Sequence, residues 1–178
     1  MKLFWINISI LSLMSCTEHN NNQILIEDKD SHITQEMLIE SNRNLTKDES
    51  FEIDQFCKHH NWPVVETETG IRHYIYEFGK GKIAKPGNWV IIDYEVRLLD
   101  SDTTLCYTSI VTGPIEFLVE MDNIESGLHE AITYMHVGDK AFIILPHYLA
   151  HGLVGNLDKI PYFSPVLYNI HLLDVQEK

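Results

Sequence analysis

The chain has 178 residues, of which 26 are acidic and 13 are basic, so its formal net charge at pH 7 is −13. This length suits one compact domain with extensions, and so negative a surface repels phosphate backbones, which argues against nucleic acid as a partner. Apolar side chains make up 44% of the residues, a content that excludes a wholly disordered chain. No apolar stretch reaches the roughly 20 residues of a membrane-spanning helix.

The first residues have the pattern of a secretory signal. Lys2 precedes an apolar run over residues 3–14, and a small residue and Cys16 follow. The end of this run resembles the lipobox of bacterial lipoproteins, which implies removal of residues 1–15 and lipidation of Cys16. Acyl chains on Cys16 would hold the chain on a membrane, at about 0.8 kcal/mol per buried methylene. The alternative is that the run forms a buried first strand or helix.

Residues 17–23 are polar and have no periodic apolar face, and residues 16–30 are predicted to form a tether. Thr17 stands where an aspartate retains lipoproteins at the inner membrane of well-studied bacteria. The resemblance therefore implies a bacterial cell envelope location with an outer-membrane lipid anchor, and we expect the domain to lie in the periplasm.

The cysteines and histidines are candidates for disulfide, metal or hydrolase chemistry. Cys57 and Cys106 are compatible with a disulfide or with two small buried thiols, and we favour buried thiols. His147 and His151 are four residues apart but follow a proline in a predicted loop, and His59 and His60 would diverge on a helix. We therefore expect no metal site and no cofactor. No nucleophile elbow supports a hydrolase triad.

Residues 31–63 are predicted to be a helical extension. Ser31 and Thr46 are candidate N-caps, and Glu49 follows Thr46 at the spacing of a capping box. Pro63 ends the helical pattern, because proline disfavours helix in the residue before it. The extension is either an arm for dimerisation or a spacer packed on the main domain, and the sequence does not decide between them.

After Pro63 the hydrophobic period changes from helical to two, which predicts strands. In the segment from Trp89 to Leu99, Val90, Ile92, Tyr94, Val96 and Leu98 share one face. The other predicted strands cover residues 71–78, 115–119, 140–145 and 166–175. One clear helix interrupts them, because Ile124, Leu128, Ala131, Ile132 and Met135 fall at helical spacing. The fold class is therefore α+β, with a twisted antiparallel sheet wrapped around one short helix.

The strongest signal is an ordered series of motifs over about residues 69–176. It consists of Thr69-Gly70-Ile71, Gly79-Lys80-Gly81, Pro86-Gly87-Asn88, Val90 to Tyr94, Met135 to Gly138, Leu149 to Gly152, Ile160-Pro161 and Leu167 to Leu173. The series resembles the FKBP-type peptidyl-prolyl cis-trans isomerases. The resemblance implies that residues 64–178 form an isomerase domain that acts on proline-containing polypeptides without a cofactor.

A narrower resemblance concerns the start of the predicted helix. The phrase Ile124-Glu125-Ser126-Gly127-Leu128, together with the lipoprotein start and the helical extension, is similar to gliding-motility-associated lipoproteins that carry this domain. This likeness implies folding of exported envelope proteins, with a link to gliding motility.

The family resemblance also implies which residues form the site. Tyr94 is the wall tyrosine, and the backbone N–H of Glu125 lies where the family holds a ligand carbonyl. Ile160 and Tyr168 provide an aliphatic lip and a rear aromatic wall. The residues assigned to catalysis are Tyr94, Ile124, Glu125, Leu128, His151, Ile160 and Tyr168, and those assigned to substrate binding are Tyr107, Ile115 and Phe117. For Tyr94, Phe117 and Tyr168, ordinary core packing is the alternative.

Several of these positions differ from the family's usual residues. Leu128 replaces the tryptophan that floors the pocket, Cys106-Tyr107 replaces a phenylalanine–aspartate pair, and Ile115 replaces a wall phenylalanine. His151 replaces a tyrosine, and Glu125 stands where an aliphatic residue is common. The expected pocket is less aromatic and less active than usual. A chaperone or assembly module with weakened catalysis is therefore the alternative to an isomerase.

Overall fold

The computed structural model describes residues 29–177, with side chains from Thr34 onward. The predicted signal, the lipidation site Cys16 and residues 17–28 of the tether lie outside the described residues. The elements are α1 (Lys29–His59), β1 (Val65–Glu66), β2 (Arg72–Glu77), β3 (Trp89–Leu98), β4 (Leu105–Thr108), α2 (Ser109–Thr112), β5 (Ile115–Leu118), α3 (Ser126–Ile132), β6 (Lys140–Leu145), the 3-10 turns η1 (His147–Leu149) and η2 (Gly152–Val154), and β7 (Val166–Gln176).

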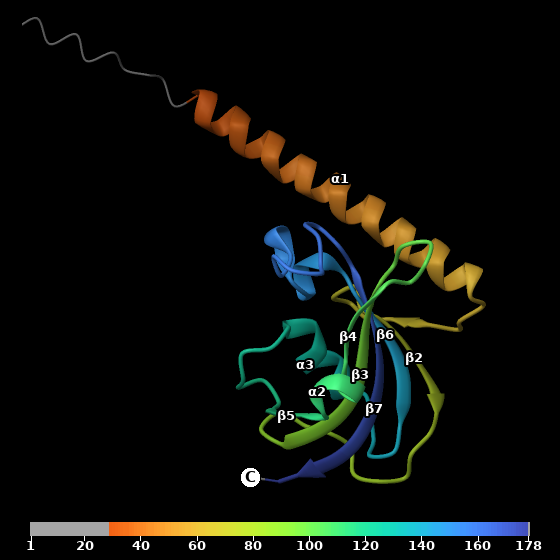
Figure 1. Ribbon diagram of the computed structural model, residues 1–178. Helices are drawn as coiled ribbons and strands as arrows, with labels where there is room; N and C mark the ends of the chain where they lie inside the picture. Colours follow the sequence, from red (N-terminus) through yellow and green to blue (C-terminus); the bar gives the residue numbers. More distant parts are fainter. Residues whose placement is uncertain (1–28, 178) are drawn as a thin grey trace, which may run out of the picture. The chain divides into compact units, whose positions relative to one another are not determined.

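The strands form one antiparallel seven-stranded sheet in the order β1-β2-β6-β7-β3-β4, with β5 paired to the other part of β3 (Figure 1). The long central strands β3 and β7 pair from Trp89–Gln176 to Leu98–Val166. A bulge between Ile91 and Ile92 interrupts their register and increases the local bend of the sheet. The predicted α+β fold with an antiparallel sheet is confirmed.

The predicted strands agree with β2, β3, β5, β6 and β7 to within two residues at each end. β1, β4 and the one-turn helix α2 were not predicted from the sequence. Elements of two to four residues show little hydrophobic period, although β5, which also has four residues, was predicted. In α2, Thr108 accepts a hydrogen bond from the N–H of Ile110 at 3.2 Å through its side chain, as an N-cap does. This missed turn lies beside Tyr94, which the sequence assigns to the site.

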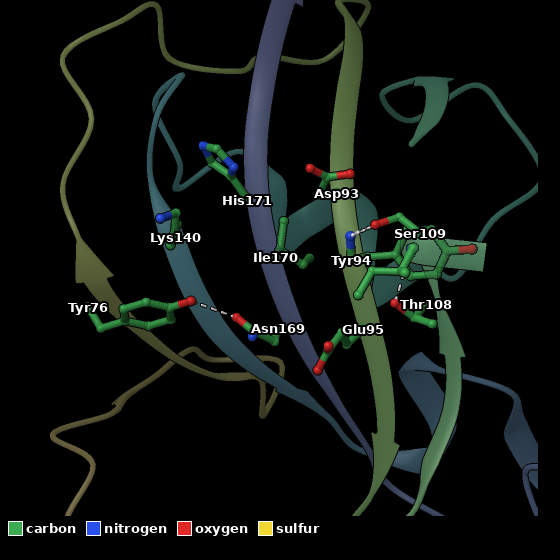
Figure 2. A pocket seen from close by; sticks show the side chains of 11 residues that line it. Tyr76, Asp93, Tyr94, Glu95, Thr108, Ser109, Lys140, Asn169, Ile170 and His171 are labelled. Atoms are coloured by element: carbon green, nitrogen blue, oxygen red, sulfur yellow. Dashed lines mark hydrogen bonds between the residues drawn. The ribbon is translucent and has the colours of Figure 1, made fainter. Parts of the chain in front are cut away.

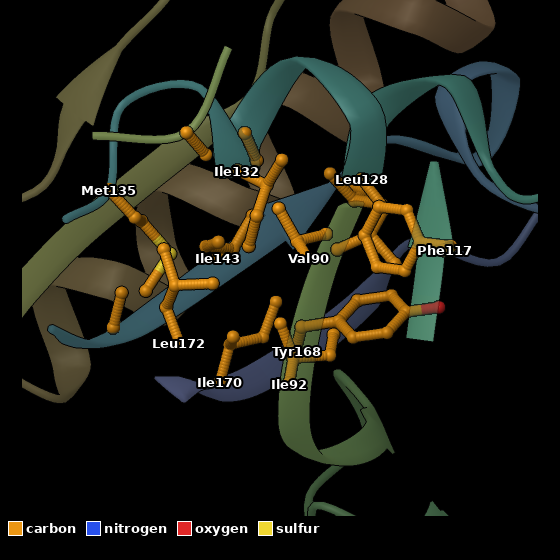
Figure 3. Packing of buried hydrophobic residues seen from close by; sticks show 14 of the residues in the cluster. Val90, Ile92, Phe117, Leu128, Ile132, Met135, Ile143, Tyr168, Ile170 and Leu172 are labelled. Atoms are coloured by element: carbon orange, nitrogen blue, oxygen red, sulfur yellow. The ribbon is translucent and has the colours of Figure 1, made fainter. Parts of the chain in front are cut away.

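The helix α3 packs its apolar side across the sheet and forms the main core. Leu128 and Ile132 of α3 are buried among Val90 and Ile92 of β3 and Ile143 of β6 (Figure 3). Fully burying one such side chain stabilises a fold by roughly 1.5–3 kcal/mol. The alternation predicted for β3 is correct, since its even-numbered residues Val90, Ile92 and Val96 are the buried ones.

Helix α1 is continuous, so the predicted N-cap at Thr46 is wrong. The hydroxyl of Thr46 instead donates to the carbonyl of Asn42, one turn back, at 3.0 Å. Glu49 does not complete a capping box, because its carboxylate is buried against His147, with Oε1 2.7 Å from the backbone N and Oε2 2.8 Å from Nδ1. The helix also begins at Lys29, before the other candidate cap, Ser31. A tertiary contact across 98 positions thus overrides a local capping pattern.

The last turns of α1 belong to the compact unit of the protein, which begins at Ile39. Ile53 is fully buried and forms a second apolar cluster with Cys57, Ile144 and Leu167. Just past the helix, Trp62 stacks on Phe142 with ring centroids 4.2 Å apart. From Glu49 onward the predicted extension is therefore packed on the main domain. None of the helices within residues 29–177 is long and apolar enough to cross a membrane.

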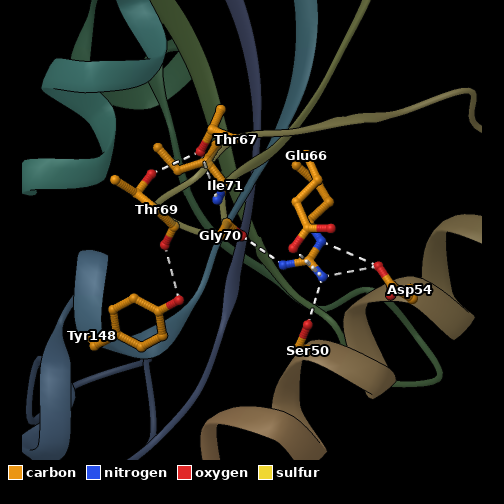
Figure 4. A network of polar contacts seen from close by, with 9 residues as sticks. Ser50, Asp54, Glu66, Thr67, Thr69, Gly70, Ile71 and Tyr148 are labelled. Carbon is orange, nitrogen blue, oxygen red and sulfur yellow. Dashed lines mark hydrogen bonds and ion pairs between the residues drawn. The ribbon is translucent and has the colours of Figure 1, made fainter.

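A buried arginine joins the same helix to the edge of the sheet (Figure 4). Arg72 of β2, only 2% exposed, donates to Ser50 and Asp54 of α1 at 2.6 and 3.1 Å and to the carbonyl of Gly70 at 2.7 Å. It also pairs with Glu66 of β1 at 3.1 Å. Because a buried guanidinium must have its donors satisfied, these contacts specify where α1 docks.

The two cysteines are free and buried, as favoured from the sequence. Burial raises the pKa of the Cys57 thiol to about 11, and the nearby Asp54 carboxylate adds to this increase. Burial also raises the pKa of Cys106. Both side chains therefore act as small apolar groups at neutral pH.

The packing of α1 predicts the effect of truncating Ile53. We expect Ile53→Ala to lower the free energy of unfolding by about 2–5 kcal/mol, because it leaves a cavity between α1 and the sheet. Phe51→Ala is the matched control, since Phe51 is 64% exposed on the same helix, and it should change stability by no more than about 0.5 kcal/mol. Urea unfolding of the full chain measures both. Equal stability of Ile53→Ala and the wild type would show that α1 does not pack there.

Candidate active site between the sheet and helix α3

The residues predicted to line the site lie around the start of α3, on the neighbouring strands and on the loop after β6. Four of them form a closed inner layer and are at most 4% exposed: Phe117, Leu128, Ile160 and Tyr168. Figure 3 shows the rings of Phe117 and Tyr168 beside Leu128. These side chains are part of the main core, so the wall that they form is already packed by the molecule's own atoms.

A second group of predicted residues is half-buried above this layer. Tyr94, Tyr107, Ile115 and Ile124 pack against the core while keeping part of their surface accessible. The hydroxyl of Tyr94 lies 3.1 Å from Oγ1 of Thr112 in α2, which holds the end of its ring. A ligand that approaches the site would meet these side chains before the inner layer.

Glu125, His151 and Tyr168 form a polar group at the start of α3. Oε1 of Glu125 lies 3.1 Å from Nε2 of His151, and these side chains are 17% and 23% exposed. The Tyr168 hydroxyl interacts with the same Glu125 carboxylate. Burial raises the pKa of Tyr168 well above its ordinary value, and the charge of Glu125 adds to the effect, so the phenol stays protonated.

The loop after β6 therefore has two fixed points on the rest of the domain. His151 is held by Glu125 at the start of α3, and His147, one turn earlier in the chain, is held by Glu49 of α1. The two histidines that share i,i+4 spacing have separate carboxylate partners and do not converge. Among residues 34–177, whose side chains the structure describes, no group of three or more histidine, cysteine, aspartate or glutamate side chains is placed to hold a metal ion.

Tyr107 belongs to a separate polar group near Ile160. Its hydroxyl donates to Asp158 at 3.1 Å and accepts from the amide of Asn156, and the ammonium of Lys159 lies 4.9 Å from the centre of its ring. Oδ1 of Asn156 accepts the backbone N–H groups of residues 158, 159 and 160 at 2.8–3.1 Å. Asn156 thus shapes the loop that carries Ile160. Sequence analysis missed it, although asparagine after glycine is a turn signal.

The opposite face of the sheet carries an open polar depression of about 260 Å³ beside the strand that bears Tyr94 (Figure 2). Tyr76 donates to Asn169 there at 2.8 Å, and the residues that line the depression include Asp93, Lys140 and His171. None of the residues predicted for the site except Tyr94 contributes to it. The two faces of β3 therefore differ in chemistry, polar on this side and mostly apolar beneath α3.

The arrangement beneath α3 suits binding rather than acid–base or covalent chemistry. It offers the half-buried side chains of Tyr94, Tyr107, Ile115 and Ile124 over a closed apolar layer, the Glu125 carboxylate beside His151, and the N–H of Glu125, which bonds to no other group among the described residues. An apolar, uncharged group can contact the half-buried side chains and accept one hydrogen bond from this N–H.

Two solved structures share this fold. The 1.6 Å crystal structure of the peptidyl-prolyl cis-trans isomerase of Pseudomonas syringae pv. tomato DC3000 superimposes with a TM-score of 0.64 and 26% identity, over 76% of this chain and 96% of that one. The crystal structure of FkpA from Escherichia coli gives a TM-score of 0.60 over 85% of this chain and 72% of that one, with 24% identity.

Curated relatives agree with the structures. The FKBP-type 22 kDa peptidyl-prolyl cis-trans isomerase of Escherichia coli K12 is 33% identical over 113 residues, which are 63% of this chain and 53% of the relative. The chain spans about half or less of the length of the curated relatives that it matches first. A model of the FKBP-type peptidyl-prolyl cis-trans isomerase family matches residues 80–173, more than half of the chain. The protein therefore belongs to the FKBP-type peptidyl-prolyl cis-trans isomerase family.

Proposed function

We propose that the domain catalyses cis–trans isomerisation of peptide bonds that precede proline in polypeptides. The observation that carries the proposal is the family match over residues 80–173, which covers every strand from β3 to most of β7, together with α3. The apolar layer under α3 supports it, because it supplies the water-poor surface that this reaction needs.

The reaction requires no proton or electron transfer. A peptide bond loses its resonance as it rotates, and this loss creates a barrier of about 20 kcal/mol. The planar amide is more dipolar than the twisted one, so an apolar site raises the ground state relative to the transition state. A catalyst needs only to favour the twisted bond.

The residues of the site have separate roles in this proposal. The side chains of Tyr94 and Ile124 form the accessible wall, and Leu128 and Tyr168 exclude water beneath them. The N–H of Glu125 donates to a carbonyl of the bound polypeptide, as the family resemblance implies. Because Leu128 and His151 replace the family's usual aromatic residues, we expect a lower rate of isomerisation.

Tyr94→Ala tests the position of the site. We expect it to lower kcat/KM for a proline-containing tetrapeptide about tenfold, because it removes the half-buried wall. Tyr76→Ala is the matched control and should leave the rate unchanged. The Tyr76 ring contacts Phe142 and its hydroxyl bonds to Asn169, whereas Tyr94 packs against the core under α3. A coupled isomerisation assay on the full chain measures both variants, and thermal unfolding verifies their folding. Equal rates for folded Tyr94→Ala and the wild type would place the site elsewhere.

A second candidate function is a chaperone or assembly module that binds unfolded chains with little catalysis. It is favoured by exposed apolar side chains on two segments near the site. One segment is α2, with Ile110 and Val111, and the other follows η1, with Leu153, Val154 and Leu157. Single exposed apolar residues are common, whereas several together are typical of surfaces that bind other proteins.

A direct comparison separates the two functions. For an isomerase we expect acceleration of tetrapeptide isomerisation at catalytic amounts of protein. For a binding module, the tetrapeptide rate stays at its spontaneous value while equimolar protein suppresses aggregation of an unfolded client. Replacing Val111 and Leu157 by serine should weaken aggregation suppression and leave tetrapeptide turnover unchanged. An isomerisation rate indistinguishable from the spontaneous one contradicts the first function.

We further propose that the protein is a lipoprotein of the bacterial envelope that assists folding of exported proteins, with a role linked to gliding motility. The support is the sequence of residues 1–30 and the phrase from Ile124 to Leu128, as analysed above. Dimerisation through α1 is part of the same proposal and is supported by the exposure of Met37, Leu38 and Ile39.

Cys16→Ser tests the anchor. We expect the variant to move from the membrane fraction to the soluble fraction of cells that process lipoproteins, because it lacks the thiol that takes the lipid. Radiolabelled palmitate should mark the wild type and leave the variant unlabelled. Ser15→Ala keeps a small residue before the cysteine and serves as the control. Membrane association of an unlabelled Cys16→Ser protein would rule out lipid anchoring.

A further inference from the structure

Glu125 places an acidic side chain inside a site whose other walls are mostly apolar. It is the residue just before α3, with its own backbone φ of −59° and ψ of 131°, and its carbonyl accepts the N–H groups of Leu128 and His129. The backbone of Glu125 is therefore fixed by the helix. Its side chain is 17% exposed, which leaves part of it accessible to a bound ligand.

Two polar side chains lie beside this carboxylate. Nε2 of His151 lies 3.1 Å from Oε1, and the Tyr168 hydroxyl interacts with the same carboxylate. Both side chains come from other elements, the loop after β6 and strand β7. With only 17% of its side chain exposed, Glu125 is packed among these neighbours and is not a freely solvated surface group.

The other charged groups around the site are engaged elsewhere. Lys159 donates to the carbonyl of Cys106 at 2.8 Å and lies over Tyr107, whereas Asp158 accepts from Tyr107. Asp122 accepts the N–H of Leu118 at 2.7 Å. Within residues 34–177, His151 is the one basic side chain within ion-pair distance of Glu125. When the imidazole is neutral, the site therefore carries a net negative charge at this point.

We propose that Glu125 is a specificity-determining residue, which favours substrates with a basic side chain adjacent to the proline and disfavours acidic ones. The inference rests on the proposed isomerase function. The Glu125 N–H would hold a substrate carbonyl, and the carboxylate belongs to the same residue, so side chains next to that carbonyl pass close to the charge. A fixed, partly buried charge acts more strongly on them than a solvated surface charge does.

The expected ligand is thus an unfolded segment with lysine or arginine beside proline. The overall charge of −13 attracts the same peptides, but it acts over long range and weakens as salt is added. A local effect of Glu125 persists at high salt and depends on one side chain. These differences separate local selection from general attraction.

The experiment measures kcat/KM of the full chain with two series of tetrapeptides at pH 8 and 0.5 M salt. Lysine, glutamine or glutamate stands before the proline in one series and after it in the other. In at least one series we expect the wild type to prefer lysine to glutamate roughly fivefold. Glu125→Gln, which keeps the size and the hydrogen-bonding atoms, should reduce this ratio to about one, and Glu125→Asp should retain part of it.

Two further variants serve as controls. Glu116→Gln removes the same charge from an exposed position on β5, next to Phe117 but on the other face of the strand, and should keep the wild-type ratio. His151→Gln retains a donor to Glu125 without a basic group, and it should keep or increase the ratio. Thermal unfolding confirms that each variant is folded.

A failure of the specificity proposal can be told apart from a failure of the proposed isomerase activity. Absence of catalysis with every peptide would refute the proposed isomerase and the inference with it. Catalysis with the same lysine-to-glutamate ratio in the wild type and Glu125→Gln would refute the inference alone. Loss of the ratio in Glu116→Gln as well would assign the preference to net charge, and that result also overturns a role for Glu125.

Discussion

The burial of one face of α3 against β3, β6 and β7 is the constraint on which the site depends. Leu128, Ala131 and Ile132 are removed from water together, and their burial fixes both the height and the rotation of the helix over the sheet. Because α3 has only seven residues, its rotation also decides the direction of the residue before it. Glu125 therefore projects toward Tyr168 and His151 as a consequence of apolar packing, and the polar group at the site follows from the core.

The strands and α3 could be predicted from the sequence because their signals are local. Alternation in β3 and the spacing from Ile124 to Met135 depend only on which residues face the core. The partners of Glu49 and Arg72 could not be predicted, because these side chains find their acceptors and donors on elements that are distant in the chain. The capping pattern at Thr46 was misleading for the same reason, since a buried ion pair outweighs a weak local preference.

The site shows the same difference between features that a local sequence signal predicts and contacts between elements that are distant in the chain. The family resemblance located Tyr94, Leu128, Ile160 and Tyr168, and their common position beside α3 follows from the fold. The contact between Glu125 and His151 could not be predicted in this way. Taken singly, Glu125 shows only that the usual aliphatic side chain is missing, and His151 shows only that the usual tyrosine is missing. Considered together, the substitutions exchange part of an apolar wall for a compact acid–imidazole–phenol group. In the isomerase proposed above, the change affects which peptides fit as well as how fast they react.

The protonated, inaccessible state of Cys57 and Cys106 has a consequence for biogenesis. Thiol–disulfide exchange needs a thiolate that can reach its partner sulfur, and burial withholds both the charge and the access. The domain can then mature without an oxidoreductase and remain indifferent to the redox poise around it.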